Sequence, residues 1–519
     1  MYLMRRGGCA LAVRLARGML AFGACTALVS CAVGPVYHRP APPAVKDYTA
    51  TAETTLIPAA PSAQGSVAGS QTLEPGVAVS PRWWEGFGSP AVDRSITLAL
   101  LHNPDLAAAQ ATLEQAQFEL KAARGVFYPQ VSLGLGGART RTTGAGGGGS
   151  ADTHLYNLYT GQVSVSYDPD VFGLNRLVAR AAGAQVDMAR DQLAAARLAI
   201  EGNVLNATLH LATLAEEVVA IRQMVDDQRQ ILDLTRTRYE LGAASEFDLL
   251  AQQSQLASSE ARLQQLQQAR DQTRHLLATY LGEFPSQADG LKVTTLDALH
   301  LPASLPVSLP SALVRARPDI RAAEARLRAA NAEVAEAVAR MYPAFELTGN
   351  FGGQSNNGGA LFDPASRMWN LAASLLMPVF AGGTLEAQKD ASEAAYRAVF
   401  ATYQSTVLGA FREVADVLRA LQHDSAALDA EARALQSAQQ AFDLVRIQYR
   451  AGAVDYLNLL GSETQYQNAR IAFVQAKAQR YADTAALYVA LGGGAWDSPG
   501  ASGAGQTRTT GPQEKRPIN

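Results

Sequence analysis

Apolar residues recur at every seventh position over two long stretches of the chain. One series ends at Tyr239 and the other at Tyr449; their members are Val204, Leu211, Val218, Val225 and Leu232, then Phe400, Val407, Val414, Leu421, Leu428, Leu435 and Phe442. This period is typical of long helices that pack side by side. A helix over 174–241 would be about 100 Å long at roughly 1.5 Å per residue. The pattern therefore predicts long rods rather than a compact domain.

A second apolar series follows each rod. Its members are Leu249, Leu256, Leu263, Arg270 and Leu277 in one stretch, and Leu459, Tyr466, Phe473, Arg480 and Leu487 in the other. Gly242 and Gly452 are natural residues for ending the first helix, while Ser245 and Asp455 can cap the next. Each stretch thus predicts an antiparallel helical hairpin. We expect the two arginines to line a lumen or, in preference, to extend their charged ends toward water.

The chain contains an internal duplication. Asn103-Pro104-Asp105-Leu106 recurs as Arg317-Pro318-Asp319-Ile320, and Phe127-Tyr128-Pro129 recurs as Met341-Tyr342-Pro343. The two copies also end alike, at Tyr280-Leu281-Gly282 and Ala490-Leu491-Gly492. We therefore predict one repeat over 82–300 and a second over 301–492.

Each repeat also contains a pair of segments with a two-residue period. They lie at about 128–140 and 155–168 in the first repeat, and at about 344–353 and 368–378 in the second. Apolar residues such as Val131, Leu133 and Leu135 alternate with small or polar ones, the pattern of strands in a transmembrane β-barrel. Helical hairpins alone would also suit a coiled coil of a filament or motor, and these strands argue against that alternative.

Four strands cannot close a barrel, and an open edge in lipid would leave backbone groups unpaired. Closure must come from other subunits. Two copies would give eight strands with almost no lumen, whereas three copies would give twelve. We therefore predict a mainly α protein with β structure, in which three copies close a 12-stranded β-barrel in the outer membrane and place all their long helical hairpins on one side of it.

Composition narrows the function. The chain of 519 residues has a formal net charge of -3 and 7% aromatic residues, so it lacks the basic surplus of a nucleic-acid-binding protein. No run of 18 apolar residues follows the first thirty, so we predict no transmembrane helix. The seven histidines are scattered without metal-binding spacing, and no nucleophile and base are placed together. We expect no metal, no other cofactor and no enzymatic activity.

The N-terminus resembles a lipoprotein export signal. Arg5 and Arg6 precede an apolar segment that ends in Leu28-Val29-Ser30-Cys31. The resemblance implies removal of residues 1–30 and a covalent lipid, such as palmitate, on Cys31. Ala32 follows instead of the aspartate that retains lipoproteins in the inner membrane, which implies the outer membrane. We expect an extended linker over 31–81 and a disordered tail over 493–519.

Taken together, the chain resembles the TolC-like outer-membrane factor family, in its NodT- and OprM-type efflux lipoproteins. The resemblance rests on Cys31, the duplicated Pro-Asp motifs, both Tyr-x-x-Gly turns and two further motifs, Trp83-Trp84-x-x-Phe87-x-x-Pro90 and Pro378-Val379-Phe380. It implies a homotrimeric exit duct for small molecules such as drugs, lipid-anchored in the bacterial outer membrane. The long helices of the three copies would form a periplasmic α-helical barrel. The implied partners are a periplasmic adaptor protein and an inner-membrane transporter of the RND type.

In this family the helix turns meet the adaptor and close the channel. The matching positions here are Tyr239, Gly242, Ala243, Leu249 and Leu250 in the first repeat, and Tyr449, Gly452, Ala453, Asp455, Leu457 and Leu460 in the second. Leu457 matches an apolar gate position. Gly461 stands where relatives often carry an aspartate, and Asp455 or Glu463 are alternative sources of that charge.

Two other functions remain open from the sequence. One is a duct for type I protein secretion. The other is a structural lipoprotein that spans the cell envelope without forming a channel, although such a spacer has no need of strands in the membrane.

Overall fold

The computed structural model describes residues 33–45, 47–49, 56–58, 60–62, 65–143, 153–291 and 294–494. The predicted signal peptide, Cys31 and residues 495–519 of the predicted tail lie outside these residues.

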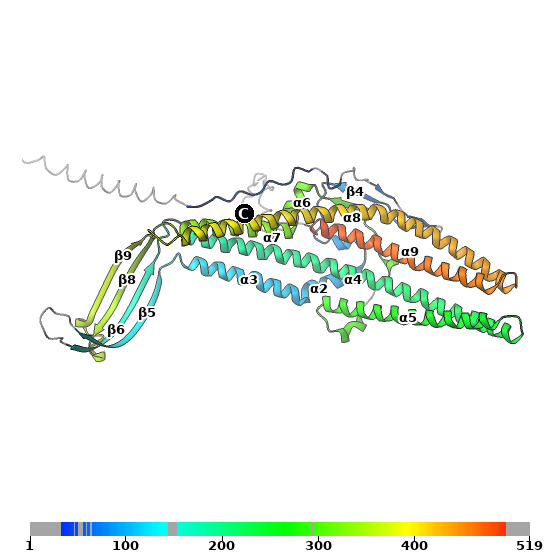
Figure 1. Ribbon diagram of the computed structural model, residues 1–519, viewed down its shortest axis with the longest axis horizontal. Helices are drawn as coiled ribbons and strands as arrows, with labels where there is room; N and C mark the ends of the chain where they lie inside the picture. The colour runs from blue at the N-terminus through cyan, green and yellow to red at the C-terminus, as the bar shows by residue number, and fades with distance from the viewer. Residues whose placement is uncertain are drawn as a thin grey trace, which may run out of the picture. The chain divides into compact units, whose positions relative to one another are not determined.

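The described chain is two copies of one order of elements (Figure 1). The first copy holds α2 (Pro90–His102), α3 (Pro104–Gly125), β5 (Gln130–Thr143), β6 (Thr153–Tyr167), α4 (Leu174–Glu240) and α5 (Glu246–Tyr280). The second holds β7 (Ser304–Val307), α6 (Pro310–Ala316), α7 (Pro318–Ala339), β8 (Ala344–Ser355), β9 (Arg367–Leu376), α8 (Thr384–Arg450) and α9 (Tyr456–Ala490). Equivalent helices have equal lengths, since α4 and α8 have 67 residues each and α5 and α9 have 35 each. The duplication therefore extends from sequence motifs to whole elements.

Two compact units are present, and they do not coincide with the two repeats. Unit 1 contains Ala111–Arg190, Ala322–Gln404 and the described N-terminal segment up to Pro40. Unit 2 contains Ala41–Gln110, Asp191–Arg321 and the described chain from Ser405 onward. Each unit takes residues from both repeats, because α4 and α8 each contribute one part to each unit.

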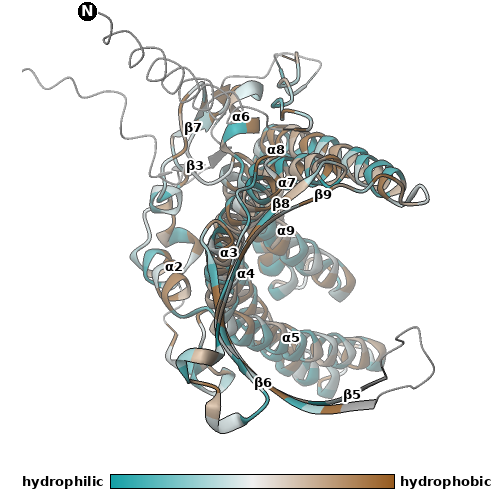
Figure 2. Ribbon diagram, turned by 90° about the vertical axis from the view of Figure 1, so that its left-hand side faces the viewer, coloured by the Kyte–Doolittle hydropathy of each residue, from teal (hydrophilic) through white to brown (hydrophobic). Residues whose placement is uncertain are grey.

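Unit 1 contains a four-stranded antiparallel sheet in the order β5-β6-β8-β9. Figure 2 shows the four strands side by side in one curved sheet. The register aligns Leu133 with Val163, Val163 with Phe351 and Phe351 with Trp369 in one row. The adjacent row aligns Ser132, Ser164, Asn350 and Asn370. Because successive side chains point to opposite faces, one face of the sheet is apolar and the other polar.

The apolar face of this sheet is uncovered within the described chain. Leu133 is 72% exposed, Trp369 76% and Leu371 78%. Strands β5 and β9 form the two edges, and neither pairs along its outer side with another described strand. The outer backbone groups of both edge strands are therefore open to pairing with a further strand.

Unit 2 is built around the predicted heptad positions. Val204, Leu211, Val218 and Leu421 are buried, and the Trp83 ring stacks on Tyr488 with centroids 5.4 Å apart. The indole nitrogen of Trp83 donates to Glu201 at 3.1 Å. This packing explains the double tryptophan of the 3-10 turn Trp83–Phe87, whose aromatic rings are buried.

The expected extended linker over 31–81 is partly folded, which corrects the prediction. Its short strands β1 (Leu56–Ile57) and β4 (Gln71–Pro75) pair antiparallel, and β4 pairs in parallel with β7. Ile57 and Leu73 are buried in unit 2. Apolar residues at these few positions pack against the core of unit 2. The Pro- and Ser-rich composition of the linker gives no sign of this packing.

Arg480 departs from the prediction in the same place. It neither reaches water nor lines an opening in this chain, because it is fully buried. Its guanidinium donates to the backbone oxygens of Pro58 and Gly69, at 3.3 and 3.1 Å. Burial lowers the pKa of Arg480, and the nearby Asp424 opposes this effect. Arg480 therefore interrupts the apolar series of α9, and its hydrogen bonds hold the linker segment against this helix. Arg270 is instead partly exposed and pairs with Asp271.

One described helix, α4, contains a stretch apolar and long enough to cross a membrane by length and composition, where we predicted none. Within the protein 72% of that stretch is buried. Its apolar residues are the packing positions of the heptad series.

Candidate functional site

The two turns that join α4 to α5 and α8 to α9 have the same backbone geometry. Gly242 and Gly452 adopt φ angles of +73° and +74°, in the left-handed region that side chains disfavour. The amides of Ala243 and Ala453 donate to the carbonyls of Arg238 and Gln448, at 2.7 and 2.9 Å. These are the glycine-ended helix caps that the two Tyr-x-x-Gly motifs predict.

Capping residues begin the second helix of each hairpin. The hydroxyl of Ser245 accepts from the amide of Asp248 at 3.1 Å, and the Asp248 carboxylate accepts from the amide of Ser245 at 3.0 Å. In the other hairpin the Asp455 carboxylate accepts from the amide of Asn458 at 2.9 Å. Asp455 is thus engaged as a helix cap.

The structure places the predicted site residues together at the turns, with different exposure. Leu457 is 57% exposed and Leu250 is 55% exposed. Leu249 and Leu460 are partly buried. The remaining predicted positions at the turns are exposed, namely Tyr239, Gly242, Ala243, Gly452, Ala453 and Asp455. Only Tyr449 is buried among the predicted set within the described turns.

Tyr239 and Tyr449 occupy equivalent positions in the repeats but differ in burial and in the contacts they make. Tyr239 is 41% exposed, whereas Tyr449 is 4% exposed. The guanidinium of Arg238, from the first hairpin, lies 4.7 Å from the centre of the Tyr449 ring and donates to its carbonyl at 3.4 Å. Tyr449 therefore joins the two hairpins through a cation–π contact.

Sequence reasoning missed a second contact between the hairpins. The hydroxyl of Tyr456 donates to the side-chain oxygen of Gln252, and the Gln252 amide donates to the backbone oxygen of Gln228 at 3.1 Å. Gln252 is fully buried, and Tyr456 is 4% exposed. The sequence signal for this contact was Gln252, a glutamine on an otherwise apolar seam. A buried amide group is held by hydrogen bonds, so such a residue indicates a polar partner.

Glu463 lies further along α9 and is buried, which differs from a charge presented to a lumen. It is 2% exposed and accepts from Gln467 at 3.2 Å. Burial raises the pKa of Glu463 to about 7; a hydrogen bond from Gln228 opposes this effect, while the negative charge of Asp227 adds to it. A carboxyl group in this position holds a proton more readily than an exposed one.

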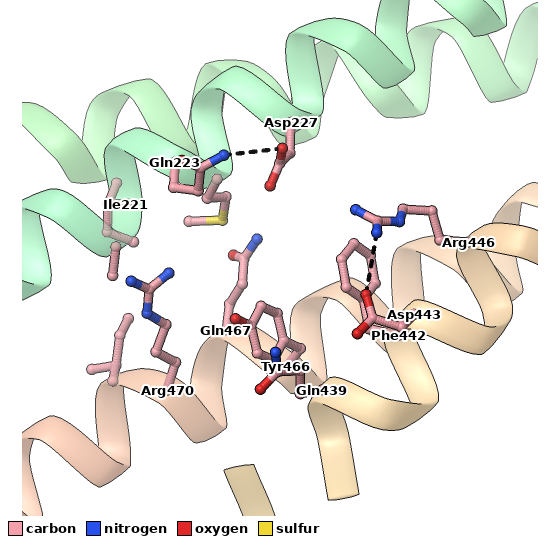
Figure 3. Close-up of a pocket in the computed structure, with 13 residues that line it drawn as sticks. Ile221, Gln223, Asp227, Gln439, Phe442, Asp443, Arg446, Tyr466, Gln467 and Arg470 are labelled. Carbon is pink, nitrogen blue, oxygen red and sulfur yellow. Dashed lines mark hydrogen bonds and ion pairs between the residues drawn. The ribbon is translucent and has the colours of Figure 1, made fainter. Parts of the chain in front are cut away.

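A cavity of about 120 Å³ opens between the hairpins beside these residues. Figure 3 shows polar side chains from both hairpins around it, with Gln223 and Asp227 on α4 facing Gln467 and Arg470 on α9. Arg446 on α8 pairs with Asp443 at 3.3 Å. The seam between the hairpins is therefore incompletely filled at this point, where polar and apolar side chains line it together.

The duplicated Pro-Asp motifs hold the other ends of the hairpins. The amide of Asn103 donates to the carbonyl of Tyr280, the last residue of α5, at 3.0 Å. The guanidinium of Arg317 donates to the carbonyl of Ala490, the last residue of α9, at 2.8 Å. Different side chains thus perform the same task, since each satisfies a helix-terminal carbonyl.

The turns present contact surface rather than metal ligands. Over the described ranges, no three His, Cys, Asp or Glu side chains gather so as to hold a metal ion. What the turns present is exposed apolar surface on two helix ends, joined by a few polar contacts. Such a site is suited to contacting another protein and to changing the separation of the hairpins.

Comparison with known proteins identifies relatives over most of the chain. The family profile described as outer membrane efflux protein matches residues 95–283 and 309–493, which are the two repeats. The pyoverdine export outer membrane protein OpmQ of Pseudomonas aeruginosa is 32% identical, covering 80% of this chain and 88% of the relative. The outer membrane protein OprJ of the same species is 30% identical, covering 92% and 96%.

A solved structure supports the same relationship. The outer-membrane channel OprN superimposes with a TM-score of 0.79 at 26% sequence identity, covering 89% of this chain and 99% of that one.

Proposed function

Because this chain belongs to the outer membrane efflux protein family, we propose that three copies form the exit duct of a tripartite efflux pump. The chain is an outer membrane efflux channel protein that reaches into the periplasm. The observation that carries the proposal is the four-stranded sheet, with one apolar face and two open edges.

Three copies give twelve strands when β9 of each joins β5 of the next. Closing the ring in this way pairs the backbone of both edges and turns the apolar faces of all strands to lipid. The polar rows that contain Ser132 and Asn370 then face the lumen. The long helices of the three copies form the α-helical barrel on the periplasmic side.

The cargo we propose is small molecules such as drugs, conducted passively. The relative OpmQ is named for pyoverdine export. This relationship favours a small-molecule cargo over a protein cargo. An adaptor protein in the periplasm and an inner-membrane transporter of the RND type supply the connection and the energy. Exposed apolar residues at the turns, including Leu241, Phe247 and Leu250, support contact with the adaptor.

The proposal includes a lipid on Cys31 after removal of residues 1–30. The described N-terminal segment supports it, since this segment lies along α7, whose end precedes β8. Gly34 lies against Ala335, and Arg39 pairs with Glu324 at 2.6 Å. The described segment therefore begins beside the end of α7 that leads into β8.

Closure at the turns is the proposed gate, with Leu457 as its apolar residue. Removing most of an exposed leucine side chain opens a constriction without disturbing the core. We expect Leu457→Ala to raise single-channel conductance in a planar lipid bilayer at least about twofold over the wild-type trimer, because three copies of the side chain line one opening.

Leu444→Ala is the matched control, because Leu444 is a similarly exposed leucine of α8 outside the turn. It should leave conductance unchanged. Equal conductance of wild-type and Leu457→Ala trimers would remove Leu457 from the gate. Absence of any conductance from folded wild-type trimers with the adaptor present would count against the duct itself.

A further inference from the structure

A groove of about 540 Å³ lies in unit 1, where α3, α4 and α7 meet the N-terminal segment. It is separate from the turns and from the polar and apolar faces of the sheet. Its charged and polar lining comes from Tyr37, Arg124, Arg180, Asp187, Arg190, Arg328 and Asn331.

The groove has a strong excess of positive charge. Asp187 is its single acidic lining residue, and two arginines share it: Arg190 at 3.1 Å and Arg328 at 3.0 Å. Arg124 and Arg180 form no ion pair with any residue that the structure describes. Four guanidinium groups against one carboxylate attract an anion.

Two buried donors in this groove also lack partners. The hydroxyl oxygen of Tyr37 and the Nε of Arg328 are both inaccessible to solvent, and neither hydrogen bonds to a described group. Burial raises the pKa of Tyr37 to about 12, so its hydroxyl keeps its proton. Buried donors without acceptors are uncommon in folded proteins, and a bound anion could pair with them once either side chain turns toward the groove.

The groove lies close to the membrane end of the same unit. Arg124 is in the last turn of α3, and β5 begins at Gln130. Arg180 is in the second turn of α4, which follows β6. These helix ends adjoin the strand ends, which stand at the level of lipid headgroups when the sheet is inserted in the membrane as proposed above.

We propose that this groove binds the phosphate headgroup of an anionic phospholipid from the periplasmic leaflet of the outer membrane. Arginine suits phosphate because its planar donors reach two oxygens at once. The acyl chains of such a lipid extend along the apolar face of the sheet. This inference goes beyond the proposed function, and it rests on that proposal for the placement of the apolar face of the sheet in lipid.

Gly183 leaves room for the headgroup. A Cβ built on this residue of α4 would meet no atom within 4 Å, so the groove is open above it. A larger side chain there would fill the groove and would also favour the helix, because glycine is a poor helix former. Gly183→Leu therefore blocks the site without unfolding α4.

The test is native mass spectrometry of the full-length protein in mild detergent, with added phosphatidylglycerol or phosphatidylcholine. We expect phosphatidylglycerol to bind more tightly, and millimolar inorganic phosphate to compete with it. Arg124→Gln combined with Arg180→Gln should weaken phosphatidylglycerol binding at least about tenfold, since each charged hydrogen bond contributes strongly. Gly183→Leu should abolish it.

Two matched controls separate the groove from general effects. Arg412→Gln with Arg433→Gln removes two exposed arginines of α8 in unit 2, and Gly409→Leu fills a helical position that is also open. Both controls should bind phosphatidylglycerol like the wild type. Equal binding of the two lipids, or wild-type binding by the groove variants, would overturn the proposal. Binding of inorganic phosphate without binding of phosphatidylglycerol would overturn the lipid assignment.

Discussion

Burial of Glu463 raises the pKa of its carboxyl group to about 7 from an ordinary value of 4.5. Below pH 4.5 the group is protonated in both the folded and the unfolded chain. Between 4.5 and about 7 the folded chain alone retains the proton, so the free energy of unfolding falls as pH rises through this window. Above it, ionised Glu463 remains buried beside Asp227, at a penalty of about 3 kcal/mol.

We therefore expect Glu463→Gln to remove this pH dependence. Urea unfolding at pH 5 and pH 8 should show that the wild type loses up to about 3 kcal/mol relative to the variant. A glutamine can still accept from Gln467, and its amide can donate to the side-chain oxygen of Gln228, which lacks a partner in the described chain. Glu240→Gln changes an exposed glutamate and serves as control. A wild-type-to-variant difference that is the same at both pH values would contradict the assignment.

At the scale of elements, two glycines of the same helical hairpin predict opposite effects of one substitution. Gly452 has a φ of +74°, while Gly409 lies inside α8. Neither would bring a Cβ within 4 Å of another group. Gly452→Ala should destabilise the protein by about 1 kcal/mol through backbone strain, and Gly409→Ala should stabilise it by about 1 kcal/mol. Unfolding midpoints measure both, and a stabilising Gly452→Ala would refute the turn geometry.

The helices and strands themselves follow from local sequence patterns, whereas the contacts between segments distant in the sequence do not. Heptads, glycine caps and two-residue periods predicted the hairpins, the turns and the four strands to within a few residues, because each is encoded over a short window. The roles of Arg480 and Gln252 depend on segments far away in the sequence. The linker strand β4 pairs with β7 across more than two hundred residues. Equivalent positions such as Tyr239 and Tyr449 differ because their neighbours differ, which a repeat in the sequence conceals.

At the scale of the whole molecule, the open edges of the sheet predict how copies join. Ser132→Cys in β5, combined in turn with Asn370→Cys, Ala372→Cys or Ser374→Cys in β9, samples adjacent registers on the polar face. Disulfides form only when the Cα atoms come within about 7 Å. We expect one combination to give a covalent trimer on a denaturing gel, while each single variant stays monomeric.

The wild type controls for the chain's own cysteines at positions 9, 25 and 31. Products that stop at dimers, or that extend past trimers, would show that β5 and β9 do not close a ring of three copies.

The hydrogen bonds from Asn103 to Tyr280 and from Arg317 to Ala490, here called clamps, have a mechanical consequence. Each fixes one end of a 35-residue helix, α5 or α9, whose length is about 52 Å at 1.5 Å per residue. Such a helix is a lever with its fulcrum at the clamp. A tilt of about 6° there displaces the far end by about 5 Å, roughly the width of one side chain. Strain of a few tenths of an ångström at the fulcrum is thus amplified into motion on the scale of a solute.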